Sequence, residues 1–569
     1  MGQLILQDVL LIFLAAIPVI LVLQILRLPA LIGFILTGAL IGPSGIGLIQ
    51  DPDRIDILAE IGVTLLLFIV GLEFSFAAFA KFKTYVVKGG VLQIVLTLLA
   101  GFLLGTVFGW PLNQGFYFGC LVALSSTAVV LTSLQDHRLQ ESIQGRIATG
   151  VLILQDLAVI PMIVFLPSLG RAAGEASPWI RLSSELGLAL VLVALVYLFI
   201  RYLSTPVLGR IFRVRSRELF LITVISFAVG MAWLTHQAGL SFALGAFLGG
   251  LMIGATDYQT EALAEMTPFR YCFNSLFFVS IGMLLDFRFL IDHLPMVMLL
   301  VLLIPAIKTA LASGIMVFLG APLRVSLVFG IILGQIGEFS FLLASLGRKT
   351  GALDPLLYQY IIAAAAVTML GTPLAVRWSI PIAEFLARVP GLRRLSRSET
   401  ESRLLEESGS FSEHVVICGF GPLGEALGHL LDQHRVEHII LELNPETIEK
   451  IRKTKKNVFF GDGASEEILY KSGIEKARLL AITTPDFFNN VATIKQARRL
   501  NPEIKIITRA KYRREVEALY DAGADIVVSE ELEGGIEIGR YALRELGVPM
   551  EEVDAYITKI REFGSADFF

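Results

Sequence analysis

Apolar stretches about as long as a membrane-spanning helix fill the first 386 of the 569 residues. A helix needs about 20 apolar residues to cross the hydrocarbon core of a bilayer. A helix also satisfies its own backbone hydrogen bonds there. We therefore predict an α-helical membrane domain with 13 spans. The predicted spans cover residues 8–26, 30–48, 56–75, 88–109, 115–135, 146–169, 183–203, 217–236, 239–256, 269–285, 293–319, 325–347 and 358–385.

The composition agrees with this prediction and excludes several other classes of protein. The chain is 55% hydrophobic and 17% charged, which is too apolar for a soluble protein of this length. Its net charge of −4 does not indicate a nucleic-acid partner. Cys120, Cys272 and Cys418 lie far apart without a metal-binding spacing, so we expect neither a disulfide nor a resident metal. The N-terminus lacks the features of a cleaved signal peptide, and we expect the first span to be retained.

Changes in polarity along the chain define its domains. We predict a membrane domain over residues 1–386, a charged linker over 387–411, an α/β nucleotide-binding domain over 412–530 and a tail over 531–569 that could form a dimer arm. An odd number of spans places the two chain ends on opposite sides. The loops on the C-terminal side carry 13 Lys and Arg residues against 6 on the other side. The positive-inside rule therefore predicts an outside N-terminus and a cytoplasmic C-terminal domain.

One predicted span carries an acidic side chain near its centre. From residue 150 to residue 167 the chain is apolar except for Gln155 and Asp156. A charged side chain at mid-bilayer costs at least about 2.5–3.5 kcal/mol, so it must face protein or a water-filled cavity. We predict that Asp156 binds a cation or a proton, and that the remaining chain moves and regulates this site.

Three further spans also carry polar residues near their centres. A lone serine or threonine commonly bonds to its own helix, but four coincident midpoints favour a functional cluster. The fifth and twelfth spans occupy matching positions if spans 1–6 and 8–13 form an inverted repeat. Unwinding at their centres would free backbone carbonyls and oppose half-helix dipoles beside an ion. The polar residues in these spans are Ser125, Ser126, Thr127, Lys308, Gln335 and Glu338.

Several motifs in the same order resemble the second family of monovalent cation:proton antiporters. With the C-terminal domain, the chain resembles the bacterial Kef-type potassium-efflux systems. The resemblance implies a homodimer, a mobile core domain that slides against a dimerisation domain, and exchange of potassium for protons in the inner membrane. The motifs are Ala123-Leu-Ser-Ser-Thr-Ala-Val-Val130, Leu154-Gln-Asp-Leu-Ala-Val-Ile-Pro161, Ser216-Arg-Glu-Leu-Phe220, Gly239-Leu-Ser-Phe-Ala-Leu-Gly-Ala-Phe-Leu-Gly249, Phe277-Phe-Val-Ser-Ile-Gly-Met283 and Gly334-Gln-Ile-Gly-Glu-Phe-Ser-Phe341.

The resemblance also implies roles for the polar residues. Asp156 is the carboxylate at which ion and proton compete, and Gln155 is its neutral neighbour. Thr127 and Ser126 lie on the crossover of the fifth span. Lys308 supplies a cation near the opposing crossover, where either Asp156, the helix dipoles or Glu338 could be its partner.

A glycine-rich fingerprint opens the soluble domain. The motif Gly419-x-Gly421-x-x-Gly424 follows a predicted strand and begins a helix, and Glu442 ends the next strand. An acidic residue there accepts from ribose hydroxyls and disfavours a 2′-phosphate, so we predict NAD(H) or an adenosine phosphate such as AMP rather than NADP. The candidate binding residues are Gly419, Phe420, Gly421, Pro422, Leu423, Gly424, Glu442, Asp462, Ala464, Thr483 and Arg509.

Regulation by glutathione is implied by the Kef resemblance, as is a soluble ancillary oxidoreductase subunit. Kef systems use an acidic cytoplasmic gating loop, and Asp257, Glu261 and Glu265 occupy its place here. The loop lacks the histidine expected of glutathione-gated members, and a solvated turn is the alternative.

Three other functions remain as alternatives. A sodium:proton antiporter would use the same carboxylate. A ligand-gated potassium channel would need a carbonyl filter such as Thr-Val-Gly-Tyr-Gly, which the sequence lacks. A membrane oxidoreductase would need a hydride-transfer partner, and no catalytic His or Tyr suggests one, so we expect no enzymatic activity.

Overall fold

The computed structural model separates into two compact units, one drawn from residues 1–392 and the other almost entirely from residues 393–569. The predicted seventh span (183–203), the loop residue Asp257 and linker residues 390–411 lie outside the described residues. The structure describes residues 2–25, 30–73, 84–137, 139–140, 142–166, 216–237, 242–256, 258–387, 389, 412–444, 447–448, 450–451 and 457–563.

The first unit is helical, and most of its helices overlap predicted spans. Seven helical segments among the described residues are long and apolar enough to cross a membrane. The helices are α1 (Gly2–Ile25), α2 (Ala30–Ile41), α3 (Pro52–Glu73), the π-helix η2 (Thr84–Gly89), α4 (Gly90–Val107), α5 (Leu112–Ala123), α6 (Thr127–Asp136), α7 (Ile143–Phe165), α10 (Arg217–Gln237), α11 (Phe242–Gly254), α12 (Gln259–Met283), α13 (Phe287–Asp292), α14 (Leu294–Phe318), α15 (Leu323–Ile332), α16 (Phe339–Lys349) and α17 (Pro355–Ala387).

Two predicted boundaries differ from the structure for local reasons. The second span was expected to continue to residue 48, but α2 ends at Ile41. Pro43 follows, and Gly47 adopts a left-handed φ of 73°, so the chain turns there. The tenth span was expected to begin at residue 269, whereas α12 begins ten residues earlier. Ala262 and Met266 are buried one helical turn apart, which extends this helix beyond its apolar segment.

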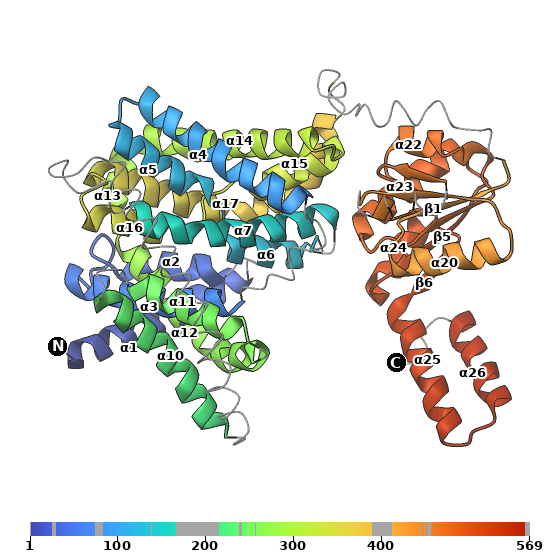
Figure 1. Ribbon diagram of the computed structural model, residues 1–569, viewed down its shortest axis with the longest axis horizontal. Coiled ribbons are helices and arrows are strands. Elements are labelled where there is room, and N and C mark those ends of the chain that lie inside the picture. Colours follow the sequence, from blue (N-terminus) through green and yellow to red (C-terminus); the bar gives the residue numbers. More distant parts are fainter. Residues whose placement is uncertain are drawn as a thin grey trace. The chain divides into compact units, whose positions relative to one another are not determined.

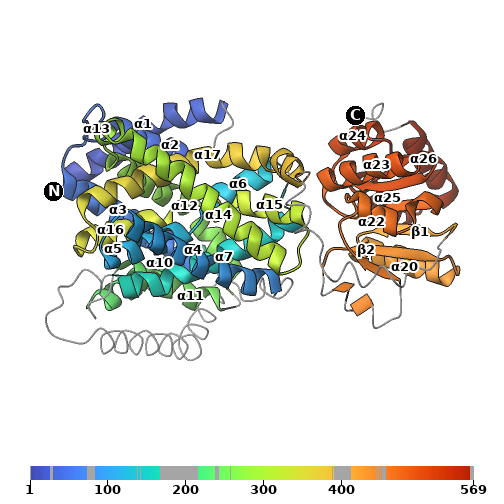
Figure 2. The ribbon, with the colours of Figure 1, turned by 90° about the horizontal axis from the view of Figure 1, so that it is seen from above.

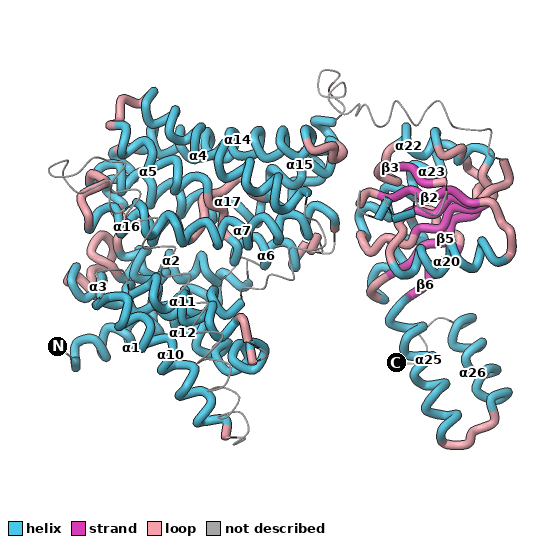
Figure 3. Tube along the Cα trace, viewed as in Figure 1, coloured by secondary structure: helices cyan, strands magenta, loops and turns pink. Residues whose placement is uncertain are grey.

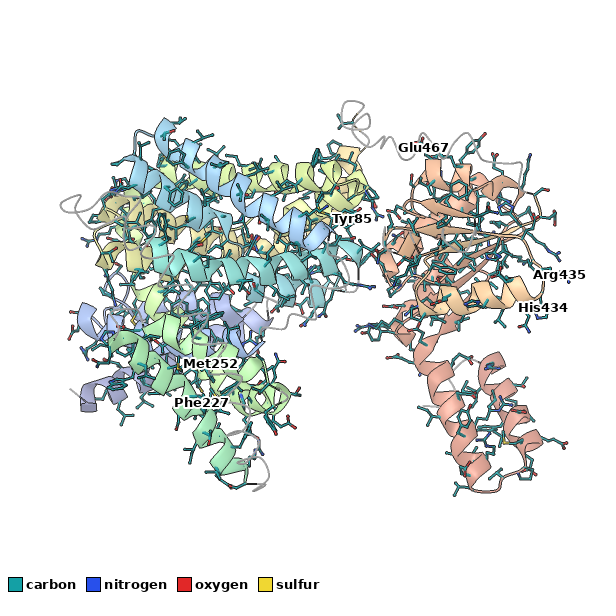
Figure 4. All side chains as sticks on the ribbon, in the orientation of Figure 1. Tyr85, Phe227, Met252, His434, Arg435 and Glu467 are labelled. Carbon is teal, nitrogen blue, oxygen red and sulfur yellow. The ribbon has the colours of Figure 1, made fainter. Side chains whose placement is uncertain are left out.

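Packing divides these helices into two bundles. The scaffold bundle contains α1, α2, α3, α10, α11 and α12, and α3 packs closely on α11 and α12 (Figure 1). Phe227 of α10 and Met252 of α11 are labelled within this bundle (Figure 4). The crossover bundle contains α4, α5, α6, α7, α14, α15, α16 and α17, which pack on one another. Figure 2 shows these helices from above.

An apolar seam joins the two bundles. One continuous core cluster contains Leu67 and Phe278 of the scaffold bundle together with Val159, Phe341 and Ile361 of the crossover bundle. These side chains are almost completely buried. Because apolar contacts are non-directional, such a seam can stabilise more than one relative position of the two bundles.

The second unit is a parallel sheet with helices around it (Figure 3). The strand order β3-β2-β1-β4-β5-β6 reverses between β1 and β4, which is where open α/β sheets bind ligands. Val415 of β1 pairs with His438 and with Leu479. The strands are β1 (Val415–Cys418), β2 (His438–Glu442), β3 (Val458–Phe460), β4 (Leu479–Ile482), β5 (Lys505–Ala510) and β6 (Ile526–Ser529).

Helices and 3₁₀ turns connect the strands, and two further helices follow the sheet. His434 and Arg435 lie at the end of α20, where Arg435 takes a left-handed φ of 55° (Figure 4). The tail beyond β6 is an antiparallel helical pair. The helices of this unit are α20 (Pro422–Gln433), α22 (Glu466–Lys471), α23 (Phe487–Leu500), α24 (Val516–Asp521), α25 (Glu530–Glu545) and α26 (Met550–Phe563), with 3₁₀ turns η5 (Ile474–Lys476) and η6 (Arg513–Glu515).

Candidate functional site

Two broken helices cross inside the crossover bundle. Helix α5 ends at Ala123 and α6 begins at Thr127, while six non-helical residues separate α15 from α16. The two breaks touch, because the Gly337 N–H donates to the Leu124 carbonyl at 3.1 Å. A Cβ atom on Gly337 would lie 2.6 Å from the carbonyl carbon of Ser125. The prediction that the fifth and twelfth spans unwind at matching positions is confirmed.

Lys308 of α14 joins the two non-helical segments that follow the C-terminal ends of α5 and α15. Its side chain is 1% exposed. Its Nζ donates to the Leu124 carbonyl at 2.7 Å, the Gln335 carbonyl at 2.6 Å and the Ser125 hydroxyl at 3.0 Å. Helix C-termini present unpaired carbonyls and negative dipole ends. The ammonium group therefore pairs these carbonyls and offsets the negative ends of both half-helices. Of the three partners that the sequence left open for Lys308, the structure shows the helix dipoles.

Glu338 occupies the opposite, N-terminal side of the crossing. Its carboxylate accepts from the Ala128 N–H at 3.2 Å in the first turn of α6. Ser126 accepts from the Val129 N–H, which caps α6. Glu338 is 6% exposed, and its Oε2 has no hydrogen-bond partner among the described residues. A negative group thus faces the positive end of α6.

Asp156 reaches this crossing from α7. The Thr127 hydroxyl lies 3.1 Å and 3.0 Å from the two carboxylate oxygens of Asp156, so it can donate to either. Asp156 is partly exposed, whereas the adjacent Gln155 is completely buried. The exposed carboxylate and the threonine hydroxyl supply oxygens that can hold a cation or a proton.

Gln155 points into protein rather than beside Asp156. Its Oε1 accepts from the Ser125 N–H at 2.7 Å, and its Nε2 donates to Gln93 Oε1 at 2.6 Å. Gln93 was not among the residues singled out in the sequence. The available signal was an amide side chain within the otherwise apolar start of α4.

The glycine-rich loop of the second unit has the expected geometry. Gly419 follows β1 with a left-handed φ of 93°, and a Cβ atom there would lie 2.5 Å from Thr484. The Phe420 N–H donates to Glu442 Oε2 at 2.7 Å, so Glu442 lies against the loop. Gly421 precedes α20, which begins at Pro422, and Leu423 and Gly424 follow in its first turn.

The other predicted binding residues gather at the carboxyl ends of neighbouring strands. Asp462 accepts from the Ala464 N–H at 3.0 Å and from the Asn489 amide at 2.9 Å. The Thr483 hydroxyl donates to the Gly419 carbonyl at 2.8 Å. This edge therefore combines the loop, a helix N-terminus and oxygen acceptors, as a nucleotide site requires.

Arg509 of β5 is anchored at the same edge. Its guanidinium donates to the Thr483 carbonyl at 3.2 Å and forms an ion pair with Glu530 at 2.6 Å. Glu530 and the Asp462 partner Asn489 were not anticipated from the sequence, because both lie on helices remote from any motif.

Cys418, beneath the glycine-rich loop, is buried. Burial raises the pKa of its thiol, and the charges of Asp462 and Glu442 raise it further. The thiol is therefore protonated and poorly nucleophilic in the folded protein at neutral pH.

The predicted acidic gating loop is shorter than expected. Glu261 and Glu265 lie in the first turns of α12 and not in a loop. Their helical state follows from the buried Ala262 and Met266, which continue the helix into the polar segment. Glu265 forms an ion pair with Arg217 at 2.5 Å. The loop interpretation of these two glutamates is therefore wrong.

Comparison with known proteins covers almost the whole chain. Residues 9–380 match the family described as sodium/hydrogen exchanger, transmembrane, and residues 415–530 match the TrkA-N domain. The putative K(+) efflux antiporter KefB of Alkalimonas amylolytica is 32% identical over 94% of this chain and 80% of its own length. The glutathione-regulated potassium-efflux system protein KefC of Enterobacter sp. (strain 638) is 32% identical over 95% of this chain and 84% of its length.

A solved structure shares the fold of the first unit. The sodium proton antiporter MjNhaP1 of Methanocaldococcus jannaschii matches with a TM-score of 0.50 and 17% identity, over 68% of this chain and 99% of that chain. The exchanger domain, the TrkA-N domain that follows it and the end-to-end identity to two efflux antiporters agree with one another. The chain therefore belongs to the sodium/hydrogen exchanger family and, within it, to the Kef-type potassium-efflux antiporters.

Proposed function

We propose that this protein exchanges potassium for protons across the bacterial inner membrane by alternating access. The observation that carries the proposal is the Thr127–Asp156 contact beside two crossing broken helices. A carboxylate at this place can be neutralised by one proton or by one cation. Either neutral form crosses an apolar barrier at a lower cost than the bare carboxylate does. Competition for Asp156 therefore couples the two fluxes.

The crossover bundle carries this carboxylate from one side of the membrane to the other in the proposed cycle. The crossing and α7 are tied together through the Ser125–Gln155 and Thr127–Asp156 bonds, so they move as one body. The scaffold bundle provides the stationary surface, and the apolar seam lets the bundles slide without breaking many polar contacts. Two copies joined through their scaffold bundles would hold that surface fixed in the membrane.

The proposal is tested by exchange in proteoliposomes carrying a pH-sensitive dye. Asp156→Asn keeps the size of the side chain but cannot exchange a proton for a cation, so we expect no potassium-dependent proton flux. Asp136→Asn, at the exposed end of α6, is the matched control and should retain exchange. Full exchange by the Asp156→Asn protein would refute the role of this carboxylate.

Ion selectivity is measured in the same assay. We expect potassium and rubidium to drive proton movement, because the relatives named above are potassium-efflux proteins. A response to sodium alone would assign the chain to sodium:proton exchange instead. Large uncoupled currents in electrical recordings would contradict exchange altogether.

Nucleotide control through the second unit is part of the proposal. NAD(H) or AMP would bind at the glycine-rich loop, with Glu442 accepting from a ribose hydroxyl and disfavouring a 2′-phosphate. The domain would act as a regulator rather than as an enzyme, so NADH should not be consumed during transport. Glutathione is the second effector to test, because the KefC relative is named as a glutathione-regulated system.

The remaining expectations complete the proposal. The protein would be a homodimer with an outside N-terminus and a cytoplasmic nucleotide domain, and a soluble ancillary oxidoreductase subunit would bind on the cytoplasmic side. Protease cleavage after residue 412 in inside-out vesicles, but not in right-side-out vesicles, is the result expected for that orientation.

A further inference from the structure

A buried glutamine outside the predicted site contacts the broken fifth span. Gln93 of α4 is 1% exposed. Its Nε2 donates to the Ala123 carbonyl and to the Thr97 hydroxyl, both at 3.2 Å. Its Oε1 accepts from the Gln155 amide at 2.6 Å. Both ends of this amide are therefore used within the protein.

These contacts replace hydrogen bonds that an unbroken helix would make internally. In a continuous helix the Ser125 N–H would donate to the Leu121 carbonyl, and the Ala123 carbonyl would accept from the residue four positions later. Here Leu121 accepts from the Ser340 hydroxyl at 2.7 Å, and Ser125 donates to Gln155. Buried backbone groups must find such partners, because an unpaired one costs about 1–3 kcal/mol.

The two glutamines form a chain of amides across the break. Ala123, at the end of α5, is held by Gln93, and Ser125, two residues later, is held by Gln155. The break therefore has a defined length and direction, set by side chains from α4 and α7. Thr127, the first residue of α6, follows directly and carries the hydroxyl that donates to the carboxylate.

We propose that Gln93 is a positioning residue for the ion site: it fixes the Gln155 amide on the Ser125 N–H and so holds Thr127 against Asp156. Gln155 accordingly acts as a clamp on the backbone rather than as a ligand of the ion. The inference rests on the proposed exchange at Asp156 and adds the group that sets its geometry.

Leucine at position 93 removes both hydrogen-bonding ends with little change in volume. Losing a group that orients an ion ligand costs about 10–100-fold in ion affinity at metal sites. We therefore expect Gln93→Leu to raise the apparent KM for potassium about tenfold and to shift the pH of half-maximal exchange. Gln93→Asn, whose amide is one methylene too short to reach Gln155, should give a smaller change in the same direction. Thr106→Val, farther along α4, is the control and should match the unmodified protein.

Potassium-dependent melting of the purified full-length protein gives a readout that does not require transport. Ligand binding to the folded state raises the melting temperature by an amount that grows with the logarithm of one plus the ratio of ligand concentration to Kd. Gln93→Leu should need about tenfold more potassium for the same rise, again from the cost of disturbing a ligand's orientation. If the leucine protein does not insert, Gln93→Asn is measured by both methods.

Coupling between the two glutamines is tested with the Gln93→Leu/Gln155→Leu double variant. Residues that act as one clamp are non-additive, so the double variant should have the same KM as Gln155→Leu alone. A double variant whose increase in KM equals the product of the two single-variant increases would overturn the inference. So would a folded Gln93→Leu or Gln93→Asn protein whose KM and pH profile stay within about twofold of the unmodified values, the scatter expected of uncoupled sites.

Failure of the proposed function has a different signature. It would appear as no exchange by the unmodified protein, or as full exchange by Asp156→Asn. An unmodified protein that exchanges, an Asp156→Asn protein that does not, and unchanged Gln93 variants together would overturn the Gln93 inference alone.

Discussion

Single charged residues at the crossing are matched to the ends of half-helices. Lys308 contacts the two C-terminal ends, and Glu338 contacts the N-terminal end of α6. The sequence predicted that both residues belong to one cluster, because charges at bilayer depth need partners. It could not choose between Asp156, Glu338 and the helix dipoles as partners of Lys308, and the partners observed are the backbone carbonyls of Leu124 and Gln335 and the Ser125 hydroxyl. Backbone groups carry no sequence signal of their own, whereas Gln93 did carry one, as an amide within the apolar start of α4.

Lys308→Met provides the test at this scale. The substitution leaves the carbonyls of Leu124 and Gln335 without the ammonium donor, at about 1–3 kcal/mol for each buried group left unpaired. We expect a clear fall in the melting temperature of the detergent-solubilised protein. Lys349→Met is the control, because its 3.5 Å ion pair with Glu60 is exposed and such pairs contribute about 0–1 kcal/mol. Equal melting temperatures for the two variants would contradict the role of Lys308.

Helices were predictable where they are long and apolar, and their breaks were predictable only in position. The residues Ser125 and Gln335 marked the breaks correctly, since small and polar residues at mid-span weaken a helix. The contact between the breaks depends on packing, with Gly337 fitting against Ser125. Acidic residues after α11 were misassigned to a loop, because buried residues between them extend α12.

Gly337→Ala tests the crossing of the two breaks. The added Cβ would lie 2.6 Å from a backbone carbon, which cannot move aside as a flexible side chain can. Overpacking of this kind typically costs about 1–3 kcal/mol, and we expect exchange to be lost while the protein still inserts. Gly314→Ala in α14 is the matched control, since nothing lies within 4 Å of its added Cβ. An active Gly337→Ala protein would show that the two breaks can move apart at Gly337 and Ser125 without loss of exchange.

The whole molecule joins an exchanger to a sheet domain with a separate core. The strand before the glycine-rich loop and the strand that ends at Glu442 were both predicted, and they are β1 and β2. The α/β nucleotide-binding character of this unit was also predicted, and the observed parallel sheet and its strand order agree with it. Less of the membrane unit could be predicted, because the sequence of a uniformly apolar helix does not indicate which helices pack against it. The division into scaffold and crossover bundles became visible only through packing.

Separate cores predict separable functions. A chain that ends after Leu392 keeps every residue of the crossing and of α7. We expect it to exchange ions in proteoliposomes without a response to NADH or AMP. In the full-length protein, a nucleotide at about 100 times its Kd should stabilise the second unit by about 2.7 kcal/mol. Glu442→Gln, which weakens the acceptor for ribose, should reduce that stabilisation for NADH. A truncated protein that still responds to nucleotide would place the regulatory site elsewhere.

The three bonds made by Lys308 have an energetic consequence for the cell. If its ammonium group stays on backbone carbonyls throughout the cycle, the charge that changes partner among the described residues of the crossing is the single one on Asp156. One inward proton then replaces one outward potassium ion, and the moving bundle carries no net charge in either direction. Membrane voltage would neither drive nor oppose such a swap. Net exchange would stop when the inside-to-outside concentration ratios of potassium and of protons are equal.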